Sequence, residues 1–444
     1  MKQLLLLVFV AMFTGLVAQD DYYNKVLNER FPADSPGGTA IIVKKGEVVY
    51  HKAFGKANLE LDVDMTTDHI FRIGSITKQF TACAILKLAE EGKLSLDDEI
   101  TKFLPKYPTK RKTITVEHLL NHTSGIASYT GLKKWDAETR KQNFTPQEMI
   151  DYFKNEPMDF DPGDAFRYNN SGYFLLGYII EKASGMPYAD YIESTFFKPL
   201  GMSSSSYDRT SVVIPNRAAG YEPGLLGVQN ASFVSMTQPY AAGSLLSTTG
   251  DLNTWYQAVV SGKVVSRESL AKAHTPATLN TGDKTSYGFG WSLGELEGSP
   301  FFGHGGGING FLTASTYLPE EEVFVAVFSN CNCHDPGAVA NKLAVMAIGK
   351  YEERKTVELP EAMLASYVGK YELSPQFIIT ITRSGKQLKA QATGQSPIDL
   401  VAFKEHHFHH EQIGIKVRFN PDDDGKISSL TLFQNGERDA KRVE

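Results

Sequence analysis

Cysteine, long apolar runs and an excess of charge of one sign are all scarce in this chain of 444 residues. With only three cysteines, disulfides are not expected to carry the fold. Beyond the N-terminus there is no run of about eighteen or more apolar residues, so we predict no membrane-spanning helix there. The net charge of −6, with both signs interspersed, argues against a nucleic-acid partner.

The N-terminus is the exception to the shortage of apolar runs. Lys2, the apolar stretch Leu4–Phe13 and the small residue Ala18 are typical of a secretory signal peptide over residues 1–18, with cleavage before Gln19. No cysteine follows the cleavage site, so a lipid anchor is not indicated. We therefore expect the mature protein to be periplasmic or secreted.

A serine and a lysine three residues apart are the most informative feature of the rest of the chain. Ser75 and Lys78 precede apolar residues that recur every four positions, and Gly92 offers a stop, which together predict a helix. At its start, the helix dipole would help Ser75 Oγ lose a proton. A buried lysine has a lowered pKa, so Lys78 could be neutral and accept that proton.

Two later segments carry further polar groups suited to the same chemistry. Tyr168 and Asn170 follow a loop rich in Pro, Gly and Asp and precede an apolar stretch that predicts a helix. A phenol can carry protons there, and a carboxamide can orient a lysine and a substrate amide. The stretch 303–310 holds His304 among five glycines, whose backbone can approach a substrate closely. Taken alone, that stretch is more typical of a plain glycine-rich turn.

In this order, the three segments resemble the serine β-lactamase-like family, which includes class C β-lactamases, D,D-peptidases, D-aminopeptidases and related esterases. The pairs Tyr168-x-Asn170 and His304-x-Gly306 are similar to the second and third motifs of its members. The resemblance runs from about Asp34 to Lys350 and includes four further strings: His118–Gly125, Leu175–Glu181, Pro199–Met202 and Ser247–Leu252.

The resemblance implies a role for each matching residue. It implies three catalytic residues, three substrate-binding residues, two backbone N–H groups in an oxyanion hole, and neither a metal nor an organic cofactor. The catalytic residues are Ser75, Lys78 and Tyr168, the binding residues are Asn170, His304 and Gly306, and the oxyanion hole is formed by Ser75 and Gly307.

One departure from the family pattern concerns the third motif. β-Lactamases begin it with lysine and threonine, which hold a substrate carboxylate, whereas this chain has His304 and Gly305. Because a neutral imidazole is a weaker anion anchor, efficient β-lactam hydrolysis is not expected. Two roles stay open for His304: contact with Tyr168 and substrate, or packing against the strand edge to hold the glycine stretch in shape.

The expected fold is α+β: a β-lactamase/transpeptidase-like antiparallel sheet flanked by helices, with a helical region, followed by a small antiparallel β-barrel. The second part resembles a lipocalin-like domain and contains four predicted strands. We predict a hydrolase domain over 19–350, a linker over 351–361 and a barrel over 362–444. The predicted barrel strands are Phe377–Thr382, Gln387–Ala392, Ile413–Phe419 and Ile427–Phe433.

Two strings superficially suggest metal binding, and neither is assigned to it. Cys331-x-Cys333-His334 lacks a distant fourth ligand, and His406–His410 splits between two strand faces, where a solvated strand or loop is expected. Cys83 lies among apolar neighbours, which predicts a packing role.

The predicted function is that of an exported serine hydrolase that forms a covalent acyl-enzyme on amide or ester bonds of a small molecule or peptide. A D-amino-acid peptidase or carboxypeptidase-like enzyme acting on peptidoglycan-type peptides is favoured because export gives access to them. An esterase or acyltransferase and a weak β-lactamase remain alternatives. From another class, a penicillin-binding sensor that acylates without turnover also remains. The oligomeric state is left open.

Overall fold

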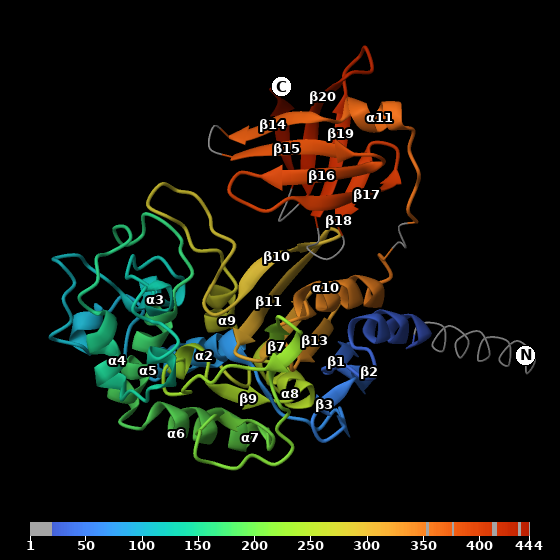
Figure 1. The fold of residues 1–444 in the computed structure, drawn as a ribbon. Helices are drawn as coiled ribbons and strands as arrows, with labels where there is room; N and C mark the ends of the chain where they lie inside the picture. Colours follow the sequence, from blue (N-terminus) through green and yellow to red (C-terminus); the bar gives the residue numbers. More distant parts are fainter. Residues whose placement is uncertain (1–19, 352–354, 375–376, 411–414, 434–436, 444) are drawn as a thin grey trace, which may run out of the picture. The chain divides into compact units, whose positions relative to one another are not determined.

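The computed structural model describes residues 20–351, 355–374, 377–410, 415–433 and 437–443. It divides into two compact units, Met1–Gly349 and Lys350–Glu444 (Figure 1). The predicted signal peptide lies outside the described residues, as do residues 413 and 414 of one predicted strand. None of the described helices is long and apolar enough to cross a bilayer.

The first unit is built on a six-stranded antiparallel sheet in the order β10-β11-β12-β13-β1-β2. Strand β1, from the start of the chain, pairs with β13, so that Gly38 faces Ser329. The antiparallel sheet confirms the predicted architecture of this unit. The strands are β1 (Gly38–Lys44), β2 (Glu47–Phe54), β10 (Ser292–Leu296), β11 (Ser299–Ile308), β12 (Phe311–Leu318) and β13 (Val323–Ser329).

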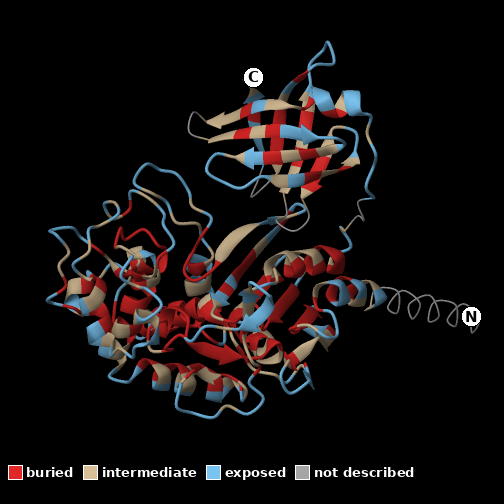
Figure 2. Cartoon of the chain, viewed as in Figure 1, coloured by how far each residue is buried: buried red, intermediate tan, exposed pale blue. Residues whose placement is uncertain are grey.

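Helices cover both faces of this sheet, which explains why β13 is apolar at nearly every position. On one face, Tyr256 of α8 (Thr249–Val260) lies 4.4 Å from Phe324 between ring centroids. On the other, Asn341 of α10 (Pro336–Ala347) contacts Thr316, which is paired with Val325. Every residue of β13 is consequently buried (Figure 2).

The middle of the first unit is mostly helical and centres on α2 (Thr77–Glu90), which packs against α5 (Asn170–Ser184). The predicted apolar spacing along α2 is confirmed, and Gly92 follows it in a left-handed conformation with φ of 69°. Residues 20–30 are also helical, and the other helices are α3 (Val116–Leu120), α4 (Pro146–Phe153), α6 (Tyr188–Ile192), α7 (Lys198–Leu200) and α9 (Arg267–Ala273).

Short elements complete the first unit. The short strands are β3 (Lys56–Asn58), β4 (Val63–Asp64), β5 (Phe71–Arg72), β6 (Ser206–Tyr207), β7 (Tyr221–Gly224), β8 (Gly227–Asn230) and β9 (Leu245–Ser247). Single helical turns lie at η1 (Gly74–Ile76), η2 (Ile100–Lys102), η3 (Tyr129–Gly131), η4 (Thr139–Lys141), η5 (Glu193–Phe197) and η6 (Tyr240–Ala242).

The second unit is a closed antiparallel barrel of eight strands, β14 to β21, which confirms the predicted barrel. Its core includes Tyr367 stacked on Phe419 at 4.4 Å. A helix, α11 (Glu361–Ser366), begins at the last residue of the predicted linker. The strands are β14 (Gly369–Ser374), β15 (Phe377–Ser384), β16 (Gln387–Ala392), β17 (Ile398–Lys404), β18 (His407–His410), β19 (Ile415–Pro421), β20 (Ile427–Phe433) and β21 (Glu437–Arg442).

The histidine-rich string differs from its prediction. Within β18, Phe408 and His409 are both buried, although a solvated strand or loop was expected. The reason is barrel closure, which brings Phe408 into the core beside Phe419. Among the described residues, no group of three His, Cys, Asp or Glu side chains is arranged to hold a metal.

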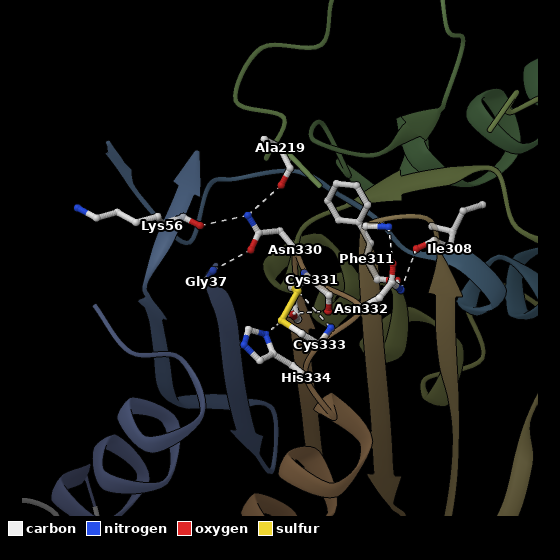
Figure 3. Close-up of a disulfide and its surroundings, with 12 residues drawn as sticks. Gly37, Lys56, Ala219, Ile308, Phe311, Asn330, Cys331, Asn332, Cys333 and His334 are labelled. Atoms are coloured by element: carbon white, nitrogen blue, oxygen red, sulfur yellow. Dashed lines mark hydrogen bonds between the residues drawn. A yellow bond between two sulfur atoms is a disulfide. The ribbon is translucent and has the colours of Figure 1, made fainter. Parts of the chain in front are cut away.

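The cysteines also differ in part from expectation. Cys83 is buried and free, as predicted, whereas Cys331 and Cys333 form a disulfide (Figure 3). Because a single residue separates them, the bond constrains little of the unfolded chain. Asn330 directly precedes the disulfide, and its side chain bonds Gly37 and three carbonyls. Asn332 lies between the two cysteines and bonds the turn between β11 and β12.

Candidate active site

Ser75 lies in the turn η1 that leads directly into α2. The preceding residue, Gly74, has a positive φ of 50°, and a Cβ there would lie 2.7 Å from Gly307 N. Glycine at this position therefore lets the serine turn meet β11 backbone to backbone. Ser75 is partly exposed, so its hydroxyl is accessible at the start of α2, as predicted.

Lys78 is fully buried, and its amine has three oxygen neighbours. Nζ lies 3.2 Å from Ser75 Oγ, 2.9 Å from Asn170 Oδ1 and 2.8 Å from Ala242 O. Among the described residues no carboxylate contributes to the shift of its pKa. Burial alone therefore lowers the pKa of Lys78 well below its usual value.

Asn170 opens helix α5, as the loop-to-helix prediction required. Asn169 caps the helix, its Oδ1 accepting from Gly172 N at 2.7 Å. Asn170 Nδ2 donates to Thr130 Oγ1 at 3.1 Å. Because the amide nitrogen is engaged there, the carbonyl oxygen of Asn170 faces Lys78.

Tyr168 lies across the amine of Lys78, whose Nζ is 4.8 Å from the centre of the phenol ring. The residue is 38% exposed. Desolvation raises the pKa of Tyr168 above its usual value, and a hydrogen bond with Ser75 partly offsets that rise. Tyr168, Ser75 and Lys78 thus come together as predicted from the sequence.

His304 is buried on β11 and held by two hydrogen bonds. Its Nδ1 lies 2.5 Å from Gly305 O, and because a carbonyl only accepts, Nδ1 carries the proton. Nε2 therefore accepts from the Tyr287 hydroxyl at 2.9 Å. Burial, with a smaller contribution from Lys78, lowers the pKa of His304 to about 3, so the ring is neutral at pH 7. Its centroid is 5.9 Å from that of Tyr168.

The glycine-rich stretch is a strand rather than a turn. Residues 303–308 belong to β11 and pair with β12, and the turn itself is confined to Asn309 and Gly310. Pairing with β12 overrides the low strand propensity of glycine. Gly306 is buried, and a Cβ there would lie 2.0 Å from Ile73 O. Gly307 is exposed beside Gly74.

Replacing Gly306 with alanine is expected to displace β11 from the serine turn. The added Cβ would overlap Ile73 O, and relief requires a backbone shift, costing about 1–3 kcal/mol of stability. We expect kcat/KM to fall by roughly 10²-fold because the shift moves Gly307 relative to Ser75.

The matched control is Gly305→Ala, whose Cβ would meet nothing closer than Thr313 O at 3.7 Å. Thermal unfolding of both variants and steady-state kinetics of Gly306→Ala provide the measurement. If Gly306→Ala unfolded at the same temperature as Gly305→Ala and kept wild-type kinetics, the tight approach would be unimportant.

Three groups at this site escaped sequence reasoning. His122 lies within a string that carried the family resemblance, but nothing in the string assigned it a role. Its buried ring lies 4.4 Å from Tyr168, 5.0 Å from Tyr173 and 4.7 Å from Tyr287 between centroids. Tyr287 lies before β10, which starts at Ser292, and belongs to no motif identified in the sequence.

The third group is the carbonyl oxygen of Ala242, which accepts from Lys78. A backbone acceptor of this kind leaves no mark in a sequence, because any residue supplies a carbonyl group.

Comparison with known proteins gives matches along most of the chain. The family model described as Beta-lactamase matches residues 27–349, and one described as a domain of unknown function (DUF3471) matches residues 353–443. A penicillin-binding protein of Bacillus subtilis (strain 168) is 29% identical over 435 residues, covering 92% of this chain and 95% of its own.

Two solved structures extend this likeness to the fold. The octameric penicillin-binding protein homologue from Pyrococcus abyssi has a TM-score of 0.67 and 30% identity, over 96% of this chain and 99% of its own. A D-stereospecific amidohydrolase from a Streptomyces species has a TM-score of 0.64 and 27% identity, over 73% of this chain and 98% of its own.

Proposed function

The chain belongs to the β-lactamase family, and on that basis we propose that it is an exported serine hydrolase forming a covalent acyl-enzyme on amide or ester bonds. The observation that carries the proposal is the environment of Lys78. A neutral amine has two N–H groups and one lone pair. The two carbonyl oxygens, Asn170 Oδ1 and Ala242 O, take the two N–H groups, which leaves the lone pair for the hydroxyl of Ser75.

Acylation then follows from this arrangement. Ser75 Oγ attacks the substrate carbonyl carbon while its proton passes to Lys78 Nζ. The carbonyl oxygen becomes an oxyanion, which the N–H groups of Ser75 and Gly307 stabilise. The approach of Gly74 to Gly307 N supports this pairing, because it brings the two backbones together.

Tyr168 completes the cycle in this proposal. Its hydroxyl contacts Ser75, so it can deliver a proton to the leaving amine or alcohol as the tetrahedral intermediate collapses. In the second half of the reaction the phenolate left by that transfer takes a proton from a water molecule, whose oxygen attacks the acyl carbon. Ser75 Oγ then leaves with the proton held on Lys78, which restores the phenol, the neutral amine and the hydroxyl.

The favoured substrate class is a D-amino-acid peptide or amide. Two features support it over a β-lactam: His304 is neutral, and Gly305 has no hydroxyl, so neither anchors a carboxylate strongly. The name of one similar structure, a D-stereospecific amidohydrolase, supports the same class. An esterase or acyltransferase uses the same machinery and is the alternative.

Export is part of the proposal and has independent support. The disulfide between Cys331 and Cys333 is a bond that persists in oxidising compartments such as the periplasm or the extracellular medium. With the predicted N-terminal signal, the disulfide supports export, and an exported enzyme would have access to peptidoglycan-type peptides.

A substrate panel tests the proposal: D-Ala-D-Ala peptides, D-aminoacyl amides, p-nitrophenyl esters and nitrocefin, compared by kcat/KM. We expect kcat/KM for D-aminoacyl substrates to exceed kcat/KM for both their L-enantiomers and nitrocefin. A preference for esters with no stereoselectivity would favour the esterase alternative, and efficient nitrocefin hydrolysis would contradict the proposed substrate class.

The same panel applied to two variants of His304 tests its role. His304→Ala is expected to lower kcat/KM by roughly 10²-fold, since the imidazole braces Tyr287 beside Tyr168. His304→Lys should raise kcat/KM for carboxylate-bearing substrates relative to that for neutral esters. If His304→Ala changes only the melting temperature, the imidazole is scaffolding.

A further inference from the structure

His122 follows helix α3 by two residues and holds the backbone on both sides of Tyr168. The N–H of Arg167 donates to His122 O over 3.0 Å. The N–H of Asn169 donates to His122 Nδ1 over 3.1 Å. One residue thus accepts hydrogen bonds from both chain neighbours of Tyr168, which fixes the backbone from which the tyrosine side chain projects.

The ring of His122 is also the nearest aromatic neighbour of Tyr168 in the described part of the chain, with centroids 4.4 Å apart. Tyr287 and His304 lie farther from the tyrosine ring, at 6.1 and 5.9 Å. Tyr168 is 38% exposed, whereas His122 is 1% exposed. His122 therefore provides the buried wall against which the tyrosine ring rests.

This position has two local costs for His122. Its φ is 63°, a region that residues other than glycine adopt uncommonly. Its buried Nε2 has no hydrogen-bond partner among the described residues. Strained backbone and unpaired buried polar groups gather at functional sites, where the surrounding structure enforces them. An apolar ring would avoid the unpaired Nε2, whereas the positive φ belongs to the backbone at this position whichever residue occupies it.

We propose that His122 is a positioning residue for acyl transfer: its carbonyl oxygen, its Nδ1 and its ring face together hold the Tyr168 hydroxyl against Ser75. The inference rests on the proposed function, because His122 acts only through Tyr168. Without the ring or the Nδ1 acceptor, Tyr168 samples more orientations. Proton transfer to the leaving group then slows, while substrate binding changes little.

Two substitutions separate the two side-chain contacts. His122→Phe keeps an aromatic face and removes the Nδ1 acceptor. His122→Asn keeps an acceptor, tolerates the positive φ and removes the ring. Each is expected to lower kcat by about 10- to 10²-fold with KM changed less than about threefold. A rise in KM with kcat unchanged would overturn the proposal.

A double-mutant cycle with Tyr168→Phe tests whether the effect passes through the tyrosine. We expect His122→Phe to cost nothing further in the Tyr168→Phe background, because the hydroxyl it positions is gone. If His122→Phe lowered kcat by the same factor in both backgrounds, the positioning role would be overturned. If His122→Phe does not fold, His122→Asn is carried through the identical cycle.

Failure of the proposed function has a different signature. Wild-type kcat in Ser75→Ala would contradict the serine mechanism, and wild-type kcat in Tyr168→Phe would contradict the role of Tyr168 and this inference with it. An additive cycle combined with an inactive Ser75→Ala would contradict only the role of His122.

His274 provides a matched control for the substitution itself. Its ring is largely buried and stacked on Phe302 at 3.7 Å, and its Nε2 also lacks a partner among the described residues. We expect His274→Phe to alter the melting temperature at most, with kcat unchanged. A loss of kcat that vanished in the Tyr168→Phe background for His274→Phe as well would overturn the specific role of His122.

Discussion

Replacing Ser75 with alanine is expected to lower kcat for every substrate by about 10⁴- to 10⁶-fold, the scale seen when a catalytic serine is removed. Without Oγ no covalent bond to the acyl group forms, and Lys78 has no hydroxyl to deprotonate. Stability should change little because Ser75 is partly exposed and its side chain packs into no apolar core. Steady-state kinetics and thermal unfolding of the purified variant are the measurements.

Intact mass separates turnover from stalled acylation in the same experiment. The wild-type protein, mixed with a fluorescent penicillin or an activated ester, should show a burst and then steady product release. A mass increase that persists in the wild type would instead support a sensor that acylates once. In either case Ser75→Ala should gain no mass, and a labelled Ser75→Ala protein would contradict the assignment of the nucleophile.

Ser261→Ala is the matched control, because Ser261 lies exposed at the end of α8. Its kinetics and its labelling should equal those of the wild type. If a clean preparation of Ser75→Ala retained turnover while this control behaved like the wild type, the mechanism would be contradicted.

The parts of the site that sequence reasoning found are those in which chemistry and spacing are local. Ser75 and Lys78 lie three residues apart at the start of a helix, and an apolar repeat predicted that helix. Tyr168 and Asn170 flank the helix cap Asn169, and the composition of the preceding loop predicted that a helix begins there. Such features depend on a few neighbouring residues, so they can be read before any tertiary contact is known.

The parts it missed depend on contacts between distant segments. His122 bonds Asn169, 47 positions along the chain. Ala242 offers Lys78 only its carbonyl oxygen, across a separation of 164 positions. The glycine-rich stretch becomes a strand only because β12 pairs with it. Propensity and motif carry no information about such pairings. For this reason His122 and Ala242 were missed, and the glycine-rich stretch taken alone was read as a turn.

The fold shows the same division. Strands β16 and β20 have the predicted bounds because each is an alternating run between turn signals. The short strand β18 has no such alternation, since it consists of histidines around one phenylalanine. Its partly buried state follows from closure of the barrel, which is a property of all eight strands together.

Replacing Lys78 with methionine is expected to lower kcat by about 10³- to 10⁵-fold and to make stability less dependent on pH. Ser75 loses its base, and a hydroxyl with a pKa far above 7 is a poor nucleophile alone. The native lysine is buried with a pKa well below its unfolded value. Between those two pKa values the unfolded state binds a proton that the native state lacks, so burial of Lys78 destabilises the wild type there, increasingly as pH falls.

Methionine removes that pH-dependent penalty but leaves Asn170 Oδ1 and Ala242 O without the amine donor. The melting temperature of Lys78→Met should therefore fall less steeply with decreasing pH than that of the wild type. Lys87→Met, in the last turn of the same helix, is the control for the substitution and should keep wild-type kinetics. A Lys78→Met protein with wild-type kcat would contradict the role of the amine as base.

The pH dependence of the wild type tests the same role without a mutation. The active form of Lys78 is the neutral amine, so kcat/KM should decrease as pH falls through the lowered pKa of Lys78 and should be sustained above it. Titration of His304 does not cause such a decrease in kcat/KM near neutral pH, because its pKa is about 3. In the residual activity of Lys78→Met this decrease of kcat/KM with falling pH should disappear. A wild-type profile that rises only near pH 10 would mean that Lys78 is protonated in the resting enzyme, and the amine could not then take the proton from Ser75.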